Sequence, residues 1–242
     1  MATGYGQSKW VSEKVIHEAS KRGLDAVIVR SGYVLGDAKT GVSNTDDFLV
    51  RMLKGCVQIG SRPDVTNTIN MVPVTHVARL INAMAFWGDK GTTAHVEAHP
   101  RLTFNEFLET LEDYGYAVPR EDYASWKQKV VEYVEAEDSK REELALLGLY
   151  HMVTGNLPEA TKAPNLNDRN AQRALEADKK VFAPVDGPAG VTKEAVGAYL
   201  AFLSERGFMA APKDATKLPA LQLSSEQVAA LNKAGGRGGS AS

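Results

Sequence analysis

The segment TGYGQSKWVSEKVIHEASKRGLDAVIVRSGYVLG, residues 3–36, joins a helical pattern to the pattern of a buried strand. Apolar residues recur with helical spacing from Gly6 to Arg22, and Gly23 stands where a helix is expected to end. The run from Leu24 to Arg30 is short, β-branched and almost uncharged, which is typical of a strand buried on both faces of a parallel sheet. The segment therefore predicts an α/β fold.

The same organisation continues to about residue 100. We expect a short helix from Asp46 to Lys54 and a strand from Thr68 to Val74. Thr75 is expected to cap the next helix, which runs to about Trp87. Residues 1–100 are thus predicted to form the α/β part of the chain.

Beyond Pro100 the strand signals fade and helical periods follow one another. The expected helices lie at about 103–114, 120–135, 141–154, 168–177 and 192–206. We therefore predict a mainly helical subdomain over residues 101–232. The Gly-rich end, residues 233–242, has the composition of a flexible tail.

Composition and charge limit the function. The 242 residues carry 28 Lys and Arg against 30 Asp and Glu, a formal net charge of −2, so we expect no nucleic-acid partner. Cys56, the one cysteine, cannot form an intramolecular disulfide, and we interpret it as a structural residue of a reducing, cytoplasmic compartment. No apolar run reaches the roughly 18 residues of a membrane span, and the spacing of the histidines predicts no metal site.

Tyr5 and Lys9 are the most informative polar residues. A spacing of four places both side chains on one face of a helix, close to its first turn. A phenol is a sluggish proton donor or acceptor at neutral pH unless a nearby cation stabilises its anion. Lys9, at the edge of the apolar arc of the helix, can supply that cation. The loop at 30–36 follows the predicted strand at the carboxyl end of the sheet, where ligands of α/β proteins bind.

These motifs resemble the extended short-chain dehydrogenase/reductases, whose active-site signature is Tyr-Gly-x-Ser-Lys. Residues 30–36 resemble the Arg-Pro-Gly-x-x-x-Gly loop of that family, with Ser31 in place of the proline, and residues 72–78 resemble its Val-Pro-Val-x-x-Val-Ala segment. The fold implied is the C-terminal portion of a Rossmann-type domain with a helical substrate-side subdomain.

A closer resemblance is to the reductase region of fungal-type L-2-aminoadipate reductases. It rests on residues 43–48, 70–73 and 151–159. It implies reduction, with NADPH, of an aminoadipoyl thioester held on the phosphopantetheine arm of a carrier domain. The product would be aminoadipate semialdehyde in lysine biosynthesis.

The resemblance also implies roles for individual residues. Tyr5 would protonate the oxygen that becomes negative as hydride attacks the thioester carbonyl. Lys9 would lower the pKa of Tyr5 and hold the nicotinamide ribose. Gly32, Tyr33 and Val34 would lie along the nicotinamide.

A possible substrate contact follows that loop. Asn44, Asp46 and Asp47 could meet the amino or carboxyl end of the aminoadipoyl group, although capping of the helix that begins near Asp46 explains Asn44 and Thr45 equally well. The residue types alone leave both readings open.

One departure from the family concerns the cofactor. The Gly-rich phosphate loop and the catalytic Ser or Thr of the family precede the tyrosine, and neither is found in these 242 residues. We therefore expect a fragment of the enzyme that is inactive alone. Two alternatives remain open: a fragment of a sugar-nucleotide epimerase or dehydratase, and a non-catalytic module that binds an acyl carrier.

The composition of the tail generates a first prediction. Deletion of residues 235–242 should leave the melting temperature almost unchanged, because a Gly-rich segment buries little apolar area. Differential scanning calorimetry of the full and shortened chains checks this, and a clear fall in Tm would mean that the tail docks on the body.

Overall fold

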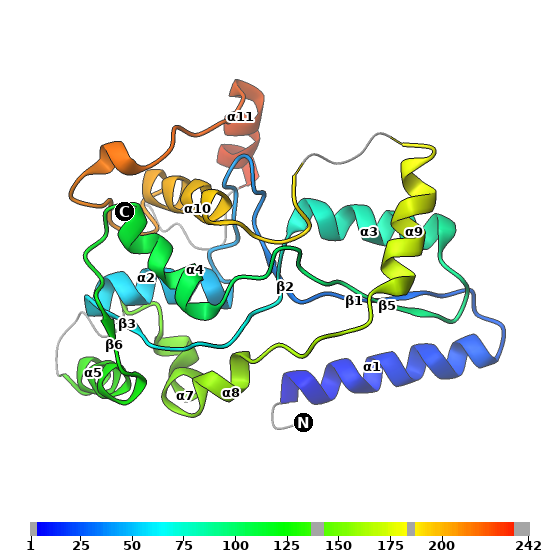
Figure 1. The fold of residues 1–242 in the computed structure, drawn as a ribbon, viewed down its shortest axis with the longest axis horizontal. Helices are drawn as coiled ribbons and strands as arrows, with labels where there is room; N and C mark the ends of the chain where they lie inside the picture. The colour runs from blue at the N-terminus through cyan, green and yellow to red at the C-terminus, as the bar shows by residue number, and fades with distance from the viewer. Residues whose placement is uncertain (1–3, 137–142, 183–186, 235–242) are drawn as a thin grey trace.

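The computed structural model describes residues 4–136, 143–182 and 187–234 (Figure 1). In this part of the chain the strands are short and form parallel pairs, with helices between the partners along the sequence. The pairs are β1 (Ile28–Arg30) with β5 (Thr93–His95), β2 (Tyr33–Leu35) with β4 (Met71–Pro73), and β3 (Arg62–Pro63) with β6 (Arg120–Glu121). Parallel pairing across intervening helices is the predicted α/β organisation.

Strands β1 and β2 form one extended segment that changes partner at Ser31 and Gly32. Val29 lies opposite Ala94 in the first pair, and Val34 lies opposite Val72 in the second. The carboxyl end of β1 is therefore a point where the chain leaves one strand partner for another.

The expected strand from Leu24 to Arg30 is wrong in its length and burial. Only Ile28–Arg30 pairs, because the partner strand β5 is itself three residues long. Ile28 and Val29 are half-buried and Arg30 is exposed, so β1 is not covered on both faces in the described structure. The expected strand at 68–74 is likewise shortened to Met71–Pro73.

Helices make up most of the described chain. Their bounds are α1 Gly4–Lys21, α2 Phe48–Ile59, α3 Val74–Trp87, α4 Phe104–Asp113, α5 Tyr123–Glu135, α7 Tyr150–Thr154, α8 Leu157–Thr161, α9 Arg169–Lys179, α10 Lys193–Glu205 and α11 Ser225–Ala234, with 3₁₀ turns at Leu147–Leu149 and Ala215–Lys217. The first two residues of the helix expected at 141–154 lie outside the described residues. The rest of that range contains the 3₁₀ turn at Leu147–Leu149, which is followed by α7.

Local capping chemistry sets several helix starts. Thr103 caps α4 and Thr192 caps α10, each through its side-chain oxygen. Thr75 is not a cap, which corrects the sequence prediction. Instead α3 begins at Val74, directly after Pro73, whose φ of −64° leads from β4 into the helix. Helix α2 continues past Lys54 to Ile59 and ends at Gly60, which adopts a φ of +78°.

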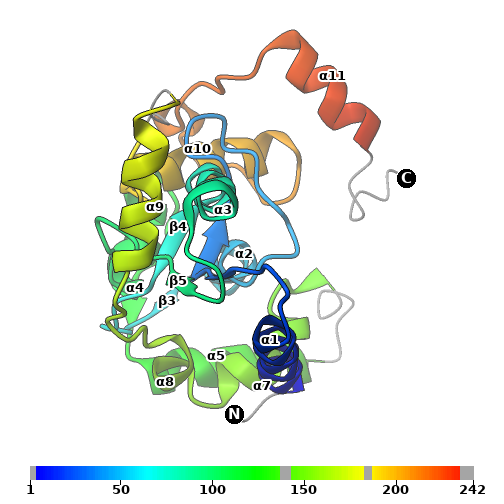
Figure 2. The same cartoon turned by 90° about the vertical axis from the view of Figure 1, so that its right-hand side faces the viewer.

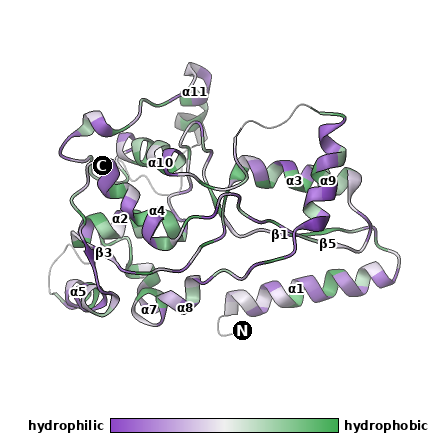
Figure 3. Ribbon diagram, in the orientation of Figure 1, coloured by the Kyte–Doolittle hydropathy of each residue, from purple (hydrophilic) through white to green (hydrophobic). Residues whose placement is uncertain are grey.

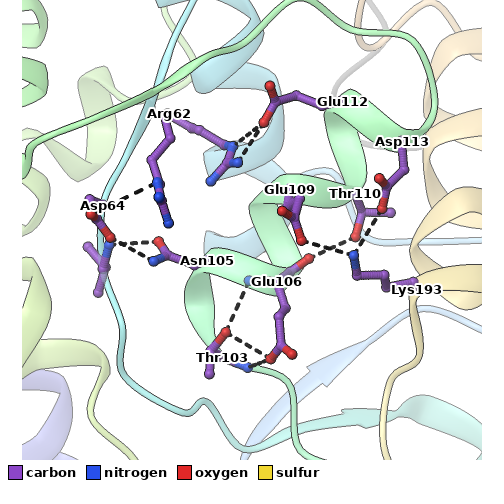
Figure 4. Close-up of polar contacts among 12 residues, drawn as sticks. Arg62, Asp64, Thr103, Asn105, Glu106, Glu109, Thr110, Glu112, Asp113 and Lys193 are labelled. Atoms are coloured by element: carbon purple, nitrogen blue, oxygen red, sulfur yellow. Dashed lines mark hydrogen bonds and ion pairs between the residues drawn. The ribbon is translucent and has the colours of Figure 1, made fainter.

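Side chains from β3 and α10 fix helix α4 (Figure 4). Arg62 donates through Nε to the Glu112 carboxylate at 2.7 Å. On the opposite side, Lys193 bridges Glu109 and Asp113 at 3.0 and 3.1 Å. These contacts join the helix to one neighbour that precedes it and one that follows it in the sequence.

Two apolar cores lie within the described chain. The larger one contains Trp126 and Tyr199 and joins α2, α4, α5 and α10. The smaller one lies between α3, α9 and β5, where the largely buried Arg79 and Asp178 form an ion pair at 2.7 Å. Each core draws residues from both sides of residue 100. The domain boundary placed there remains a prediction.

Two features of the sequence concern the membrane and the tail. Within the described ranges, no helix combines the length and the apolar character that a membrane span needs. Helix α11 extends to Ala234, so it includes the first two residues of the predicted tail. Residues 235–242 lie outside the described residues.

Asn70 connects the strand pairs in the interior. Its amide Nδ2 donates to the Val96 carbonyl at 2.6 Å, and its Oδ1 accepts from the Ala98 backbone N–H at 2.8 Å. Its own carbonyl accepts from the Tyr33 N–H at 2.8 Å. One buried residue thus joins the start of β2 to the segment that follows β5.

Asn70→Ala should lower the free energy of unfolding by about 3 kcal/mol, because two buried backbone groups lose their partner. Urea denaturation measures the loss. Asn82→Ala, which changes an exposed asparagine of α3, is the matched control and should have little effect. Equal losses in the two variants would contradict the role assigned to Asn70.

Candidate active site

Tyr5 and Lys9 form a pair on the first turns of α1. The Lys9 Nζ lies 5.5 Å from the centroid of the Tyr5 ring, and the Tyr5 side chain is 74% exposed. The Ser8 hydroxyl donates to the Tyr5 carbonyl at 2.8 Å within the same turn. The phenol and the ammonium group are therefore adjacent and accessible to a ligand.

Helix α1 runs along one side of the molecule, and none of its described residues is buried (Figures 1 and 2). Apolar residues alternate with hydrophilic ones along its ribbon (Figure 3). The side chains of Trp10, Val11 and Val15 are more than half exposed. Lys9, which the sequence places at the edge of the apolar arc, is exposed as well. A hollow of about 510 Å³ lies against Trp10, Val11 and Val15, and its lining does not include Tyr5 or Lys9.

The side of α1 that faces the body carries polar groups. Glu13, His17 and Ser20 are half-buried on one arc of the helix. The Glu13 carboxylate accepts two hydrogen bonds from the Arg30 guanidinium, one from Nε at 2.8 Å and one from a terminal nitrogen. The Arg30 hydrogen bonds hold the pKa of Glu13 below its usual range, against a smaller opposing effect of burial. This ion pair connects α1 to the end of β1.

The predicted nicotinamide loop follows directly after Arg30. A Cβ on Gly32 would approach the Asn70 carbonyl oxygen to 2.3 Å, so internal packing requires glycine there. Val34 is half-buried within β2. The Tyr33 ring lies 5.7 Å from the Phe48 ring, and burial, followed by the charge of Asp47, raises the pKa of the Tyr33 hydroxyl.

The three predicted substrate residues have local structural partners. Asp47 is the N-cap of α2 and accepts from the Leu49 and Val50 N–H groups, while burial raises the pKa of its carboxyl. Asp46 forms an ion pair with Arg51 at 2.6 Å. Asn44 accepts from the Asp46 N–H at 3.0 Å. Of the three, Asn44 and Asp46 are exposed.

The structure brings the predicted residues together in two groups. Tyr5 and Lys9 form one, and the second places Tyr33 beside Phe48 and Asp47. Within the described part of the chain, no hydrogen bond, ion pair or ring contact joins Tyr5 or Lys9 to residues 32–34. No group of three or more His, Cys, Asp or Glu among those residues is placed to hold a metal ion.

Sequence reasoning missed the residues that link these groups to the body. Glu13 follows Lys9 by one further helical step, which could have drawn attention to it, but its partner Arg30 lies 17 residues away. Asn70 precedes a strand and bonds to residues 26 and 28 positions later. No local pattern identifies such partners.

Comparison with known proteins finds relatives in sequence and similar folds among solved structures. Residues 1–81 match the family model described as "Male sterility protein" with the short name NAD_binding_4. The fold resembles the terminal R domain from the myxalamid PKS-NRPS biosynthetic pathway, with a TM-score of 0.72 and 30% identity over 88% of this chain and 52% of that one. It also resembles a thiolation-reductase di-domain from an archaeal non-ribosomal peptide synthetase, with a TM-score of 0.66 and 18% identity over 86% of this chain and 42% of that one.

The described structure is thus a Rossmann-type α/β unit of the kind found in reductase domains. The sequence relationship is narrower. The chain is 53% identical over 247 aligned residues to the L-2-aminoadipate reductase large subunit of Penicillium chrysogenum, a match that covers 99% of this chain and 18% of that protein. The chain is a relative of the L-2-aminoadipate reductases, as the resemblance predicted, and it spans less than a fifth of their length.

The Tyr5–Lys9 geometry generates a prediction for Lys9→Met in the full-length protein. The substitution keeps the apolar stem and removes the charge that favours the Tyr5 anion, so the pH midpoint that governs turnover should move to higher pH. A pH profile of kcat measures the shift. Lys14→Met, on the same helix but over the Trp10 ring, is the control, and equal profiles for Lys9→Met and wild type would count against the pair.

Proposed function

We propose that this chain carries the proton-donating, substrate-side part of an NADPH-dependent reductase that acts on a carrier-bound L-2-aminoadipoyl thioester. The observation that carries the proposal is the accessible Tyr5 phenol with the Lys9 ammonium 5.5 Å from its ring centroid. The identity to aminoadipate reductases over almost the whole chain supports it.

The residues present fit one end of the cofactor. An exposed phenol and an adjacent ammonium group are suitable partners for a ribose hydroxyl and for the reacting oxygen. The loop from Gly32 to Val34 leaves the carboxyl end of β1, although internal packing already accounts for its glycine. The described residues offer no Gly-rich strand-to-helix turn for a pyrophosphate, so the proposal assigns them only the nicotinamide end. When bound, NADPH supplies the hydride.

The chain's own groups handle the proton and the developing charge. As the thioester carbonyl carbon gains hydride, its oxygen becomes negative, and Tyr5 donates a proton to that oxygen. Lys9 stabilises the tyrosine anion that remains. Collapse of the resulting hemithioacetal breaks the carbon–sulfur bond. Its hydroxyl loses the proton and becomes the aldehyde carbonyl, and the departing thiolate takes up a proton to form the thiol.

The proposed partner is a carrier domain that presents the thioester on phosphopantetheine. One structural relative is described as a thiolation-reductase di-domain, which supports a partner of this kind. Asn44 and Asp46 have exposed side chains near the loop and remain the proposed contacts for the polar end of the acyl group. Asp47 is the weaker candidate because its carboxylate already caps α2.

The proposal predicts that Tyr5→Phe in the full-length protein lowers kcat by at least about a hundredfold, the scale of a lost general acid, with little change in KM. NADPH oxidation with the aminoadipoyl-loaded carrier measures both constants. Tyr133→Phe, which removes a hydroxyl from a packed tyrosine of α5, is the control. Turnover of Tyr5→Phe close to that of wild type would remove Tyr5 from the mechanism.

A further inference from the structure

The Glu13 side chain lies one helical step beyond Lys9, on the same side of α1. Residues four apart on a helix can have neighbouring side chains, and Lys9 and Glu13 have the spacing of an i,i+4 ion pair. In the structure the Glu13 carboxylate contacts His17, at 3.5 Å, and Arg30 from β1. Lys9 lies over the Tyr5 ring instead.

The geometry of the Arg30 contact explains why the Glu13 carboxylate pairs with Arg30 and not with Lys9. Its guanidinium approaches Glu13 with two nitrogens, one for each carboxylate oxygen, which a lysine ammonium cannot match. The Glu13 side chain is 22% exposed against 48% for Arg30, so the carboxylate is the more enclosed partner. The contact also raises the pKa of Arg30, which stays charged.

We propose that Arg30 is a positioning residue that holds the Glu13 carboxylate away from Lys9, so that the positive charge of Lys9 acts on Tyr5. The catalytic part of this inference rests on the proposed function. The titratable and charged groups in these contacts are Tyr5, Lys9, Glu13 and His17 on α1 and Arg30 from β1. Without Arg30, Glu13 would pair with Lys9 at the i,i+4 spacing and offset its charge.

The test compares Arg30→Gln with the double variant Glu13→Gln/Arg30→Gln in the full-length protein. Arg30→Gln should move the pH midpoint of kcat upward by roughly half a pH unit, since a carboxylate then neutralises Lys9. The double variant lacks the same ion pair but also lacks the carboxylate, and its midpoint should return to that of wild type. Arg30→Lys should retain part of the effect of Arg30. The profiles run from about pH 8 to 11, above the range where a histidine side chain ordinarily titrates.

A second readout does not depend on activity. The rate at which an amine acylates rises as the ammonium loses its proton, so pulse acetylation followed by mass spectrometry reports the titration of Lys9 in each variant. In Arg30→Gln the Lys9 midpoint should rise, and in the double variant it should return. Lys213, an exposed lysine in the C-terminal segment, is the internal control and should not change.

The outcomes separate the two proposals. A wild-type protein that titrates as expected but does not reduce the thioester would overturn the proposed function and leave the role of Arg30 standing. Unchanged Lys9 labelling in Arg30→Gln, or a shift that persists in the double variant, would overturn the role of Arg30. In the latter case the ion pair would serve only to fix α1 against β1.

Discussion

The buried side chain of Asn70 imposes a constraint on which the strand arrangement depends. An amide in the interior must satisfy both its donor and its acceptor, and Asn70 does so with the backbone on either side of Glu97. Its carbonyl bonds to Tyr33, and its bulk leaves room for no side chain at Gly32. The turn between β1 and β2, the start of β4 and the end of β5 are therefore fixed by one residue. Asn70 therefore also fixes the position of the loop proposed for the nicotinamide.

Helix α1 is held by a different kind of interaction. Where α4 and α10 bury apolar faces in a common core, α1 buries none of its described residues and reaches the body through the Glu13–Arg30 ion pair. Exposed ion pairs contribute little to stability, commonly below about 1 kcal/mol, but they can fix the direction of a helix and the distribution of charge along it. The same ion pair anchors β1 immediately before the loop at residues 31–36. Charge, rather than apolar packing, thus joins α1, which carries Tyr5 and Lys9, to the strand that precedes the predicted nicotinamide loop.

Several elements could be predicted because their causes are local. The side-chain oxygens of Thr103 and Thr192 satisfy N–H groups within one turn, so the starts of α4 and α10 follow from neighbouring residues. The adjacency of Tyr5 and Lys9 follows from helical spacing. The burial of Cys56 agrees with its interpretation as a structural residue, and desolvation raises the pKa of its thiol. Thr75 was mistaken for a cap because a suitable residue type was present, whereas Pro73 already set the backbone two residues earlier.

The sequence by itself determined the alternation of helices and strands and the Tyr5–Lys9 spacing, because each rests on residues close together in the chain. Its short motifs also indicated the resemblance to aminoadipate reductases. Only the tertiary structure decided the length of β1, since a strand extends as far as its partner β5 allows. It alone showed that Glu13 bonds to Arg30 and that Asn70 bonds to Val96 and Ala98, because these partners meet through long-range packing. It also assigned Asp47 to the cap of α2, a choice among neighbouring polar residues that depends on backbone direction and burial.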